Sequence, residues 1–82
     1  MRIIELDVRT LEHPVPLEKA MAAFANLEGG EMIHMIHRKY PLPLFEILGK
    51  QGGRYHSHED ENGIWHILIT RDPSVNFEVL DV

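Results

Sequence analysis

The stretches HPVPL at residues 13–17 and YPLPL at residues 40–44 decide the fold, because each joins a strand-like run to a helix-like run. Proline is tolerated in the first turn of a helix, where the N–H that it lacks would be unpaired anyway, and it holds the preceding residue extended. Each Pro–x–Pro pair is therefore predicted to form a stiff corner from a strand into a helix, with Leu17 or Leu44 entering the core.

The runs on either side of these corners predict the element order βαβαββ. The strand-like runs alternate or are short and apolar, the helix-like runs have apolar residues at helical spacing and end at Gly-Gly, and Asn-Gly favours a hairpin. The predicted elements are strands at Arg2–Val8 and Glu31–Ile36, helices at Pro16–Leu27 and Pro43–Gln51, and hairpin strands at Arg54–Glu59 and Ile64–Thr70. Right-handed crossovers make the first two strands parallel and place both helices on one face. The sequence thus predicts an α+β protein, an open-faced two-layer α/β sandwich.

The C-terminal segment is treated separately from the domain. We assign residues 1–72 to a single domain and residues 73–82 to a tail. In the tail, Val75, Phe77 and Val79 alternate with polar residues, which fits a fifth strand. The acidic turn between the hairpin strands, residues 59–62, is interpreted as a solvated tip.

Composition excludes several classes of function. The chain of 82 residues has no cysteine, which excludes disulfides, thiolate nucleophiles and cysteine-based metal centres. Its net charge of −5 argues against general nucleic-acid binding. No run approaches the roughly 20 apolar residues of a membrane span, and early charges at Glu5 and Asp7 do not suit a signal peptide. We expect a cytoplasmic protein. Its one unusual feature is a set of six histidines.

A candidate binding site lies where the two corners meet. Free N–H groups at helix starts attract anions, and the carboxyl ends of adjacent parallel strands commonly bind ligands. The charged and imidazole side chains at this edge are Arg9, His13, His37, Arg38 and Lys39. They predict a surface for a small anion or an acidic protein partner, and they fit a solvated charge cluster equally well. No catalytic constellation accompanies His13, so we do not predict an enzyme.

Two stretches resemble a known family. LDVRTLEHPVPLEKAMAAFANLEGGE, residues 6–31, is similar to the first half of the TusA (SirA-like) sulfur-carrier domains. HRKYPLPLFEILGKQGG, residues 37–53, followed by a strand containing tryptophan, resembles a related group of TusA-like domains of unknown function, some of them fused or adjacent to hemerythrin-type domains. The resemblance implies a mixed four-stranded sheet of order 1-2-4-3. It also places the family's sulfur-carrying cysteine at His13, and because imidazole cannot carry a persulfide, sulfur relay is excluded.

In that strand order, alternation places four histidines on the face opposite the helices: His34, His56, His58 and His66. Cross-strand neighbours lie about 5 Å apart, so these rings can converge on a transition metal such as zinc or copper, or on haem iron. The same face carries apolar residues, among them Ile3, Met32 and Leu68. The alternatives are therefore a homodimer interface or a surface covered by the tail.

Overall fold

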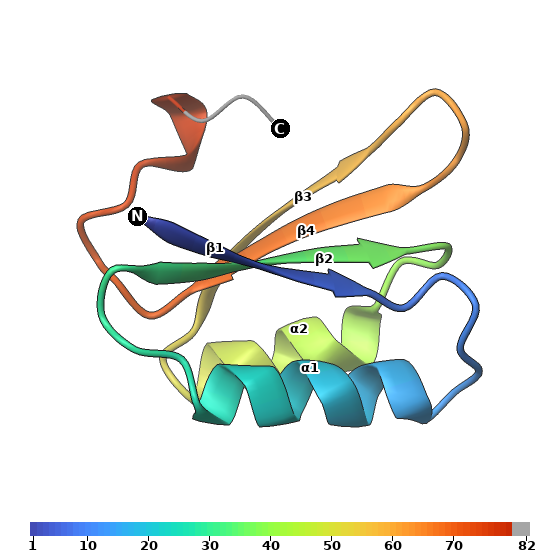
Figure 1. The fold of residues 1–82 in the computed structure, drawn as a ribbon, viewed down its shortest axis with the longest axis horizontal. Coiled ribbons are helices and arrows are strands. Elements are labelled where there is room, and N and C mark those ends of the chain that lie inside the picture. The colour runs from blue at the N-terminus through green and yellow to red at the C-terminus, as the bar shows by residue number, and fades with distance from the viewer. Residues whose placement is uncertain (80–82) are drawn as a thin grey trace.

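The computed structural model describes residues 1–79 and confirms the predicted sandwich (Figure 1). Its elements are β1 (Arg2–Asp7), α1 (Val15–Ala25), β2 (Glu31–His37), α2 (Leu42–Lys50), β3 (Arg54–Glu59), β4 (Trp65–Thr70) and the 3-10 helix η1 (Phe77–Val79). The strands form one sheet of order β1-β2-β4-β3. β1 and β2 are parallel, and β4 is antiparallel to both β2 and β3. Both helices lie below the sheet in Figure 1, and the described part of the tail, residues 73–79, lies above it.

The main core fills the space between the sheet and the helices. Ile33 and Met35 of β2 and Ile67 and Ile69 of β4 point toward the helices and are fully buried. Phe24 of α1 meets them from the other side, together with Leu44, Phe45 and Leu48 of α2. The period of two along each strand assigns these residues to one face, so the face assignment made from the sequence is confirmed.

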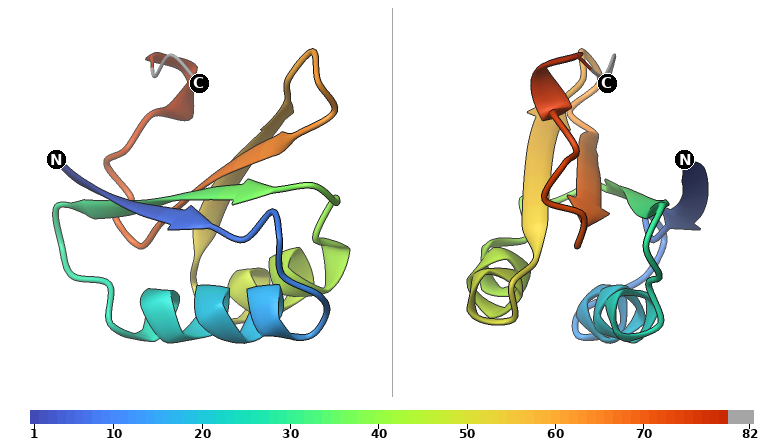
Figure 2. Two further views of the ribbon diagram at one scale, coloured as in Figure 1. Left: turned by 45° about the vertical axis from the view of Figure 1, so that its right-hand side comes forward. Right: turned by 90° about the vertical axis from the view of Figure 1, so that its left-hand side faces the viewer.

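The described part of the tail, residues 73–79, packs on the open face of the sheet. Met32, Leu68 and Val75 form a second buried cluster with Phe77 against it. The Arg54 guanidinium donates to the carbonyl oxygens of Asp72 and Val75, at 2.8 and 2.7 Å, and lies 5.1 Å from the centre of the Phe77 ring. Figure 2 shows the tail beside β3 and β4, on the side away from the helices.

The expected fifth strand is wrong for the part of the tail that the structure describes. Phe77–Val79 form a 3-10 helix, and the preceding residues form a turn in which Asp72 accepts hydrogen bonds from Ser74. Leu80, Asp81 and Val82 lie outside the described residues. The tail covers Met32 and Leu68 but leaves Ile3 at 48% exposure, so the homodimer stays a prediction. In residues 1–79, no helix has both the length and the apolar character needed to cross a bilayer.

Candidate functional site

The two Pro–x–Pro corners enclose a cavity of about 120 Å³, here called the corner cavity. Four of the five predicted binding residues line it: His13, His37, Arg38 and Lys39. Leu11, Met35 and prolines from both corners supply apolar walls. The volume holds several water molecules or a small organic molecule, and it is well below the roughly 300 Å³ at which pockets begin to suit drug-sized ligands.

The first corner leaves one free amide beside the cavity. Pro14 caps α1 and Pro16 lies in its first turn, so neither position has an N–H to offer. The Val15 N–H donates to the carbonyl oxygen of Glu12 at 2.9 Å. Within residues 1–79, the Leu17 N–H has no hydrogen-bond acceptor.

The second corner repeats this pattern. Pro41 caps α2 and Pro43 follows in the first turn, while the Leu42 N–H donates to the carbonyl oxygen of Tyr40 at 3.1 Å. Leu44 therefore keeps the only N–H of this helix start that lacks an acceptor in the described part of the chain. Each helix start thus keeps one free N–H in the described part of the chain, fewer than the sequence led us to expect. The prolines that build the corners remove the other donors.

His37 is the buried polar residue of the cavity wall, with 8% of its surface exposed. Its Nδ1 accepts a hydrogen bond from the Lys39 N–H at 3.3 Å. Burial lowers the pKa of His37 below its ordinary value, and the positive charges of Arg38 and Lys39 lower it further. The ring is therefore neutral at pH 7. Because Nδ1 accepts, the proton lies on Nε2, which becomes a further donor.

This protonation state predicts a pH dependence. A histidine whose folded pKa lies below the ordinary 6.5 stabilises the fold fully above pH 6.5, and this stability is lost as the pH falls from there through the folded pKa. We expect NMR titration of the His37 ring to give a midpoint below 6.5. In His37→Phe, this part of the pH dependence of unfolding should vanish. A midpoint at or above 6.5 would contradict a buried, neutral ring.

The positive charge gathered at this edge is smaller than the sequence suggested. Arg9 does not line the cavity and instead forms a bidentate pair with Asp7, at 2.7 and 2.9 Å, which lowers the pKa of Asp7 to about 2. Arg38 pairs with Glu12 at 2.6 Å. Among residues 1–79, Lys39 has no carboxylate partner. The site is thus defined more by hydrogen-bond donors than by net charge.

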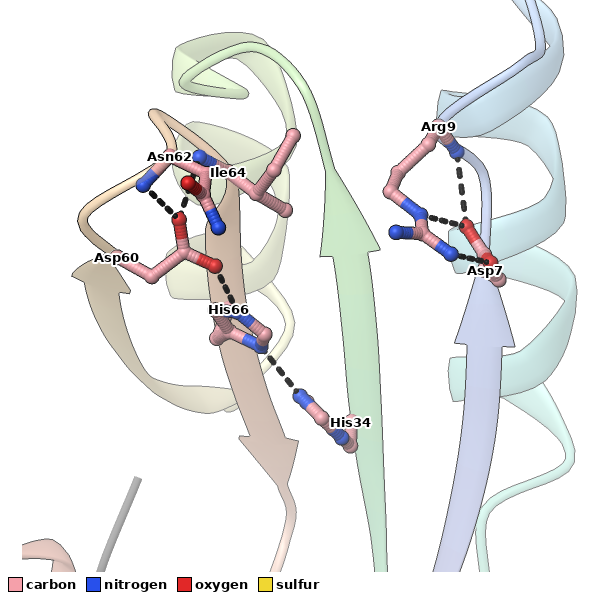
Figure 3. A network of polar contacts seen from close by, with 7 residues as sticks. All are labelled: Asp7, Arg9, His34, Asp60, Asn62, Ile64 and His66. Atoms are coloured by element: carbon pink, nitrogen blue, oxygen red, sulfur yellow. Dashed lines mark hydrogen bonds and ion pairs between the residues drawn. The ribbon is translucent and has the colours of Figure 1, made fainter.

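The four predicted metal ligands lie on the open face, but only two of them meet. The Nε2 of His34 and the Nδ1 of His66 are 3.0 Å apart (Figure 3). His58 lies opposite His66 in the β3–β4 register, and His56 stacks on Phe77 with ring centres 5.7 Å apart. Within the described part of the chain, no three His, Asp or Glu side chains are arranged to hold a metal ion.

Two carboxylates beside this pair were missed by the sequence reasoning. Glu5 lies opposite His34 in the β1–β2 register, so the strand pairing itself carried that signal. Asp60 was interpreted as part of a solvated tip. Instead, its Oδ1 accepts from the backbone N–H groups of Asn62 and Ile64, and its Oδ2 lies 2.9 Å from the Nε2 of His66.

Comparisons with known proteins agree with this fold. A family described as "Uncharacterized conserved protein (DUF2249)" matches residues 5–71. The crystal structure of a SirA-like protein from Desulfitobacterium hafniense is similar, with a TM-score of 0.71 and 20% sequence identity over 80% of this chain and 93% of the other. At that identity the likeness shows the fold alone. No curated protein matches the chain.

Proposed function

Because the chain belongs to the DUF2249 family of uncharacterized conserved proteins, its function has to be inferred from its own site, and we propose that it is a non-enzymatic binding module whose corner cavity takes a carboxylate group. The observation that carries this proposal is a set of donors on residues that line the cavity: the Leu17 and Leu44 amides, which have no acceptor within residues 1–79, and the buried His37 ring. A carboxylate offers two oxygens to these three donors without needing a donor of its own.

The composition of the cavity wall supports a carboxylate over phosphate or sulfate. Prolines remove half of the amide donors that each helix start would otherwise have. The Leu17 and Leu44 amides and the His37 ring suffice for the two oxygens of a carboxylate, whereas the four oxygens of phosphate or sulfate would also need the charged side chains of Arg38 and Lys39. Unpaired polar atoms are costly in a site with apolar walls. Leu11 and Met35 instead suit a short alkyl chain. The volume favours a small monocarboxylate, and the C-terminal carboxylate of a partner protein would present the same group.

Ligand titration tests this proposal. Acetate, propionate and butyrate, added at pH 7 and low salt, should shift the Leu17 and Leu44 amide signals most, with dissociation constants on the order of 1 mM for ligands of this size. His37→Phe should weaken binding by roughly 10–150-fold, since a hydrogen bond to a charged group contributes roughly 1.5–3 kcal/mol. His58→Gln, on the opposite face of the sheet, is the matched control and should bind as the native chain does.

Two further ligands separate the possible sources of the carboxylate. Sulfate should bind more weakly than propionate, and a short peptide with a free C-terminus should be compared with its amidated form. Tighter binding of the free-acid peptide than of propionate would identify a protein partner. The proposal would be overturned if no carboxylate shifted the Leu17 and Leu44 amide signals. It would also be overturned if His37→Phe bound the carboxylates with the same affinity as the native chain.

A further inference from the structure

A group of four aromatic rings, here called the aromatic cluster, lies beside the corner cavity: Tyr40, Phe45, Tyr55 and Trp65. The Tyr40 ring packs edge-on against Phe45 of α2 and Trp65 of β4, with centroid distances of 5.1 and 4.9 Å. Phe45 in turn stacks face to face on Tyr55 of β3, at a centroid distance of 4.1 Å and an interplanar angle of 6°. Tyr40 also lines the corner cavity, so the cluster and the cavity share one side chain.

The two tyrosines of the aromatic cluster present apolar surface to solvent. Phe45 is 2% exposed, whereas Tyr40 and Tyr55 are 50% and 39% exposed. In residues 1–79, six large apolar side chains are exposed, and three of them lie in the cluster or in the corner beside it: Tyr40, Tyr55 and Leu42. Rigid tyrosine rings are enriched where proteins bind one another, because they bury a large area and lose little side-chain freedom. The cluster therefore has the composition of a protein-binding surface.

The C-terminal residue of a protein carries the group that suits the corner cavity. A C-terminal alanine has the carboxylate, the α-carbon and the methyl group of propionate, and it differs only in that the α-carbon also bears the peptide nitrogen. The Leu17 and Leu44 amides and the His37 ring can pair its two carboxylate oxygens. Lys39, which has no carboxylate partner within residues 1–79, adds a positive charge that complements a negative chain end.

Given the proposed carboxylate site, on which this inference rests, we propose that the ligand is the C-terminal end of a partner protein. Its carboxylate occupies the corner cavity, and the residues before it lie along the aromatic cluster. Two steps between ring centres, of 5.1 and 4.1 Å, lead from Tyr40 to Tyr55. An extended peptide advances about 3.3 Å per residue, so the side chain two or three residues before the last one reaches Tyr55.

This arrangement predicts which chain ends bind. The last residue has to be small, because the cavity holds only about 120 Å³. The side chain that reaches Tyr55 has to be apolar, because it covers the exposed part of a ring. A small monocarboxylate alone occupies the cavity but leaves both tyrosines exposed to water. A chain end covers the cavity and the aromatic cluster together, so it should bind more tightly than a free acid of the same size.

Titration of the full chain with N-acetylated tetrapeptides at pH 7 and low salt tests this partner. We expect the free acid LLGA to bind about tenfold more tightly than the free acid GGGA, because one leucine side chain is partly buried on the aromatic cluster. The amidated LLGA peptide should bind at least about tenfold more weakly than its free acid, since it lacks the charged acceptor. In the native chain, LLGA should shift the ring signals of Tyr55, and GGGA should not.

Variants of the two edge strands locate the effect. Tyr55→Thr removes the far ring of the aromatic cluster and keeps a residue that suits a strand. This variant should bind LLGA and GGGA equally, and it should still bind propionate, because Tyr55 does not line the cavity. Ile3→Thr is the matched control, since Ile3 is 48% exposed on the opposite edge strand, β1. It should keep the tenfold preference for LLGA.

The outcomes separate this inference from the carboxylate site beneath it. Equal affinity for LLGA and GGGA in the native chain, with propionate bound, would overturn the protein partner and leave the carboxylate site standing. If neither propionate nor any free-acid peptide bound, both would be overturned. Octanoate binding more tightly than LLGA would show that the ligand is a fatty acid. Sedimentation that found native dimers, lost in Tyr55→Thr and unaffected by LLGA, would show that a second copy of the chain covers the cluster.

Discussion

Replacing Phe24 with alanine is expected to lower the free energy of unfolding by about 3–5 kcal/mol. The ring is fully buried between α1 and the sheet. The Arg71 guanidinium lies 3.8 Å from its centre and donates to the Phe24 carbonyl oxygen at 3.1 and 3.3 Å. A domain of this size has a total stability of roughly 4–12 kcal/mol. Urea denaturation followed by circular dichroism should therefore find the variant close to unfolding, and a loss below 1 kcal/mol would contradict this packing.

Gly53 provides a stringent check on the same contact. A Cβ at Gly53 would lie 2.9 Å from the Cζ of Phe24 and 3.2 Å from the Leu48 carbonyl oxygen. Gly53→Ala alone should cost about 1–3 kcal/mol through overpacking, and less in the Phe24→Ala background, where the ring is absent. Gly49→Ala is the matched control: its Cβ meets nothing within 4 Å inside α2, so this variant should be more stable by about 0.5–1 kcal/mol. Simple additivity of the Gly53 and Phe24 effects would show that the two residues do not interact.

Replacing Arg54 with alanine is expected to release the tail from the open face. Arg54 holds the tail through two hydrogen bonds to backbone carbonyls and its position over Phe77. Hydrogen bonds from a charged donor contribute about 1.5–3 kcal/mol, so we expect a loss of roughly 2–3 kcal/mol and faster hydrogen exchange at Val75. Arg2→Ala is the control, because its side chain is 79% exposed and its ion pair spans 3.4 Å. It should cost less than about 1 kcal/mol.

The same variant tests whether the tail keeps the open face from associating with a second chain. Release of the tail uncovers Met32 and Leu68, which are 1% and 7% exposed in the native chain. An uncovered apolar patch favours association. Sedimentation should therefore show a larger assembled fraction for Arg54→Ala than for Arg2→Ala. A native chain that is monomeric, with an Arg54→Ala variant that is also monomeric and equally stable, would show that the tail does not protect this face.

The fold could be predicted from the sequence because the patterns that specify it lie within short stretches of the chain. Alternation along β2 assigned Ile33 and Met35 to the core and His34 to the open face, and the two corners fixed where the helices start. The differences at element ends follow from particular residues. α1 begins at Val15 rather than Pro16 because Pro14 serves as its N-cap. β2 continues to His37, where the ladder with β4 reaches Trp65.

The contacts within the candidate sites were harder to predict from the sequence, because they depend on the conformations of the loops. Nothing local to Arg38 or Arg9 shows that Glu12 and Asp7 neutralise them. The role of Asp60 depends on a turn that directs one carboxylate oxygen to two amides and the other to His66. The burial of His37 did have a signal, since it shares the odd positions of β2 with Ile33 and Met35, and that signal was not used.

β2 presents histidines in two different surroundings on its opposite sides. His34 faces the open side and His37 faces the corner cavity, three residues and about 10 Å of strand apart. The sheet backbone separates the two side chains, because successive side chains of a strand point to opposite faces. Substitutions in the two sites should therefore combine additively. The side chains on one face of this seven-residue segment can therefore change while those on the other face stay the same.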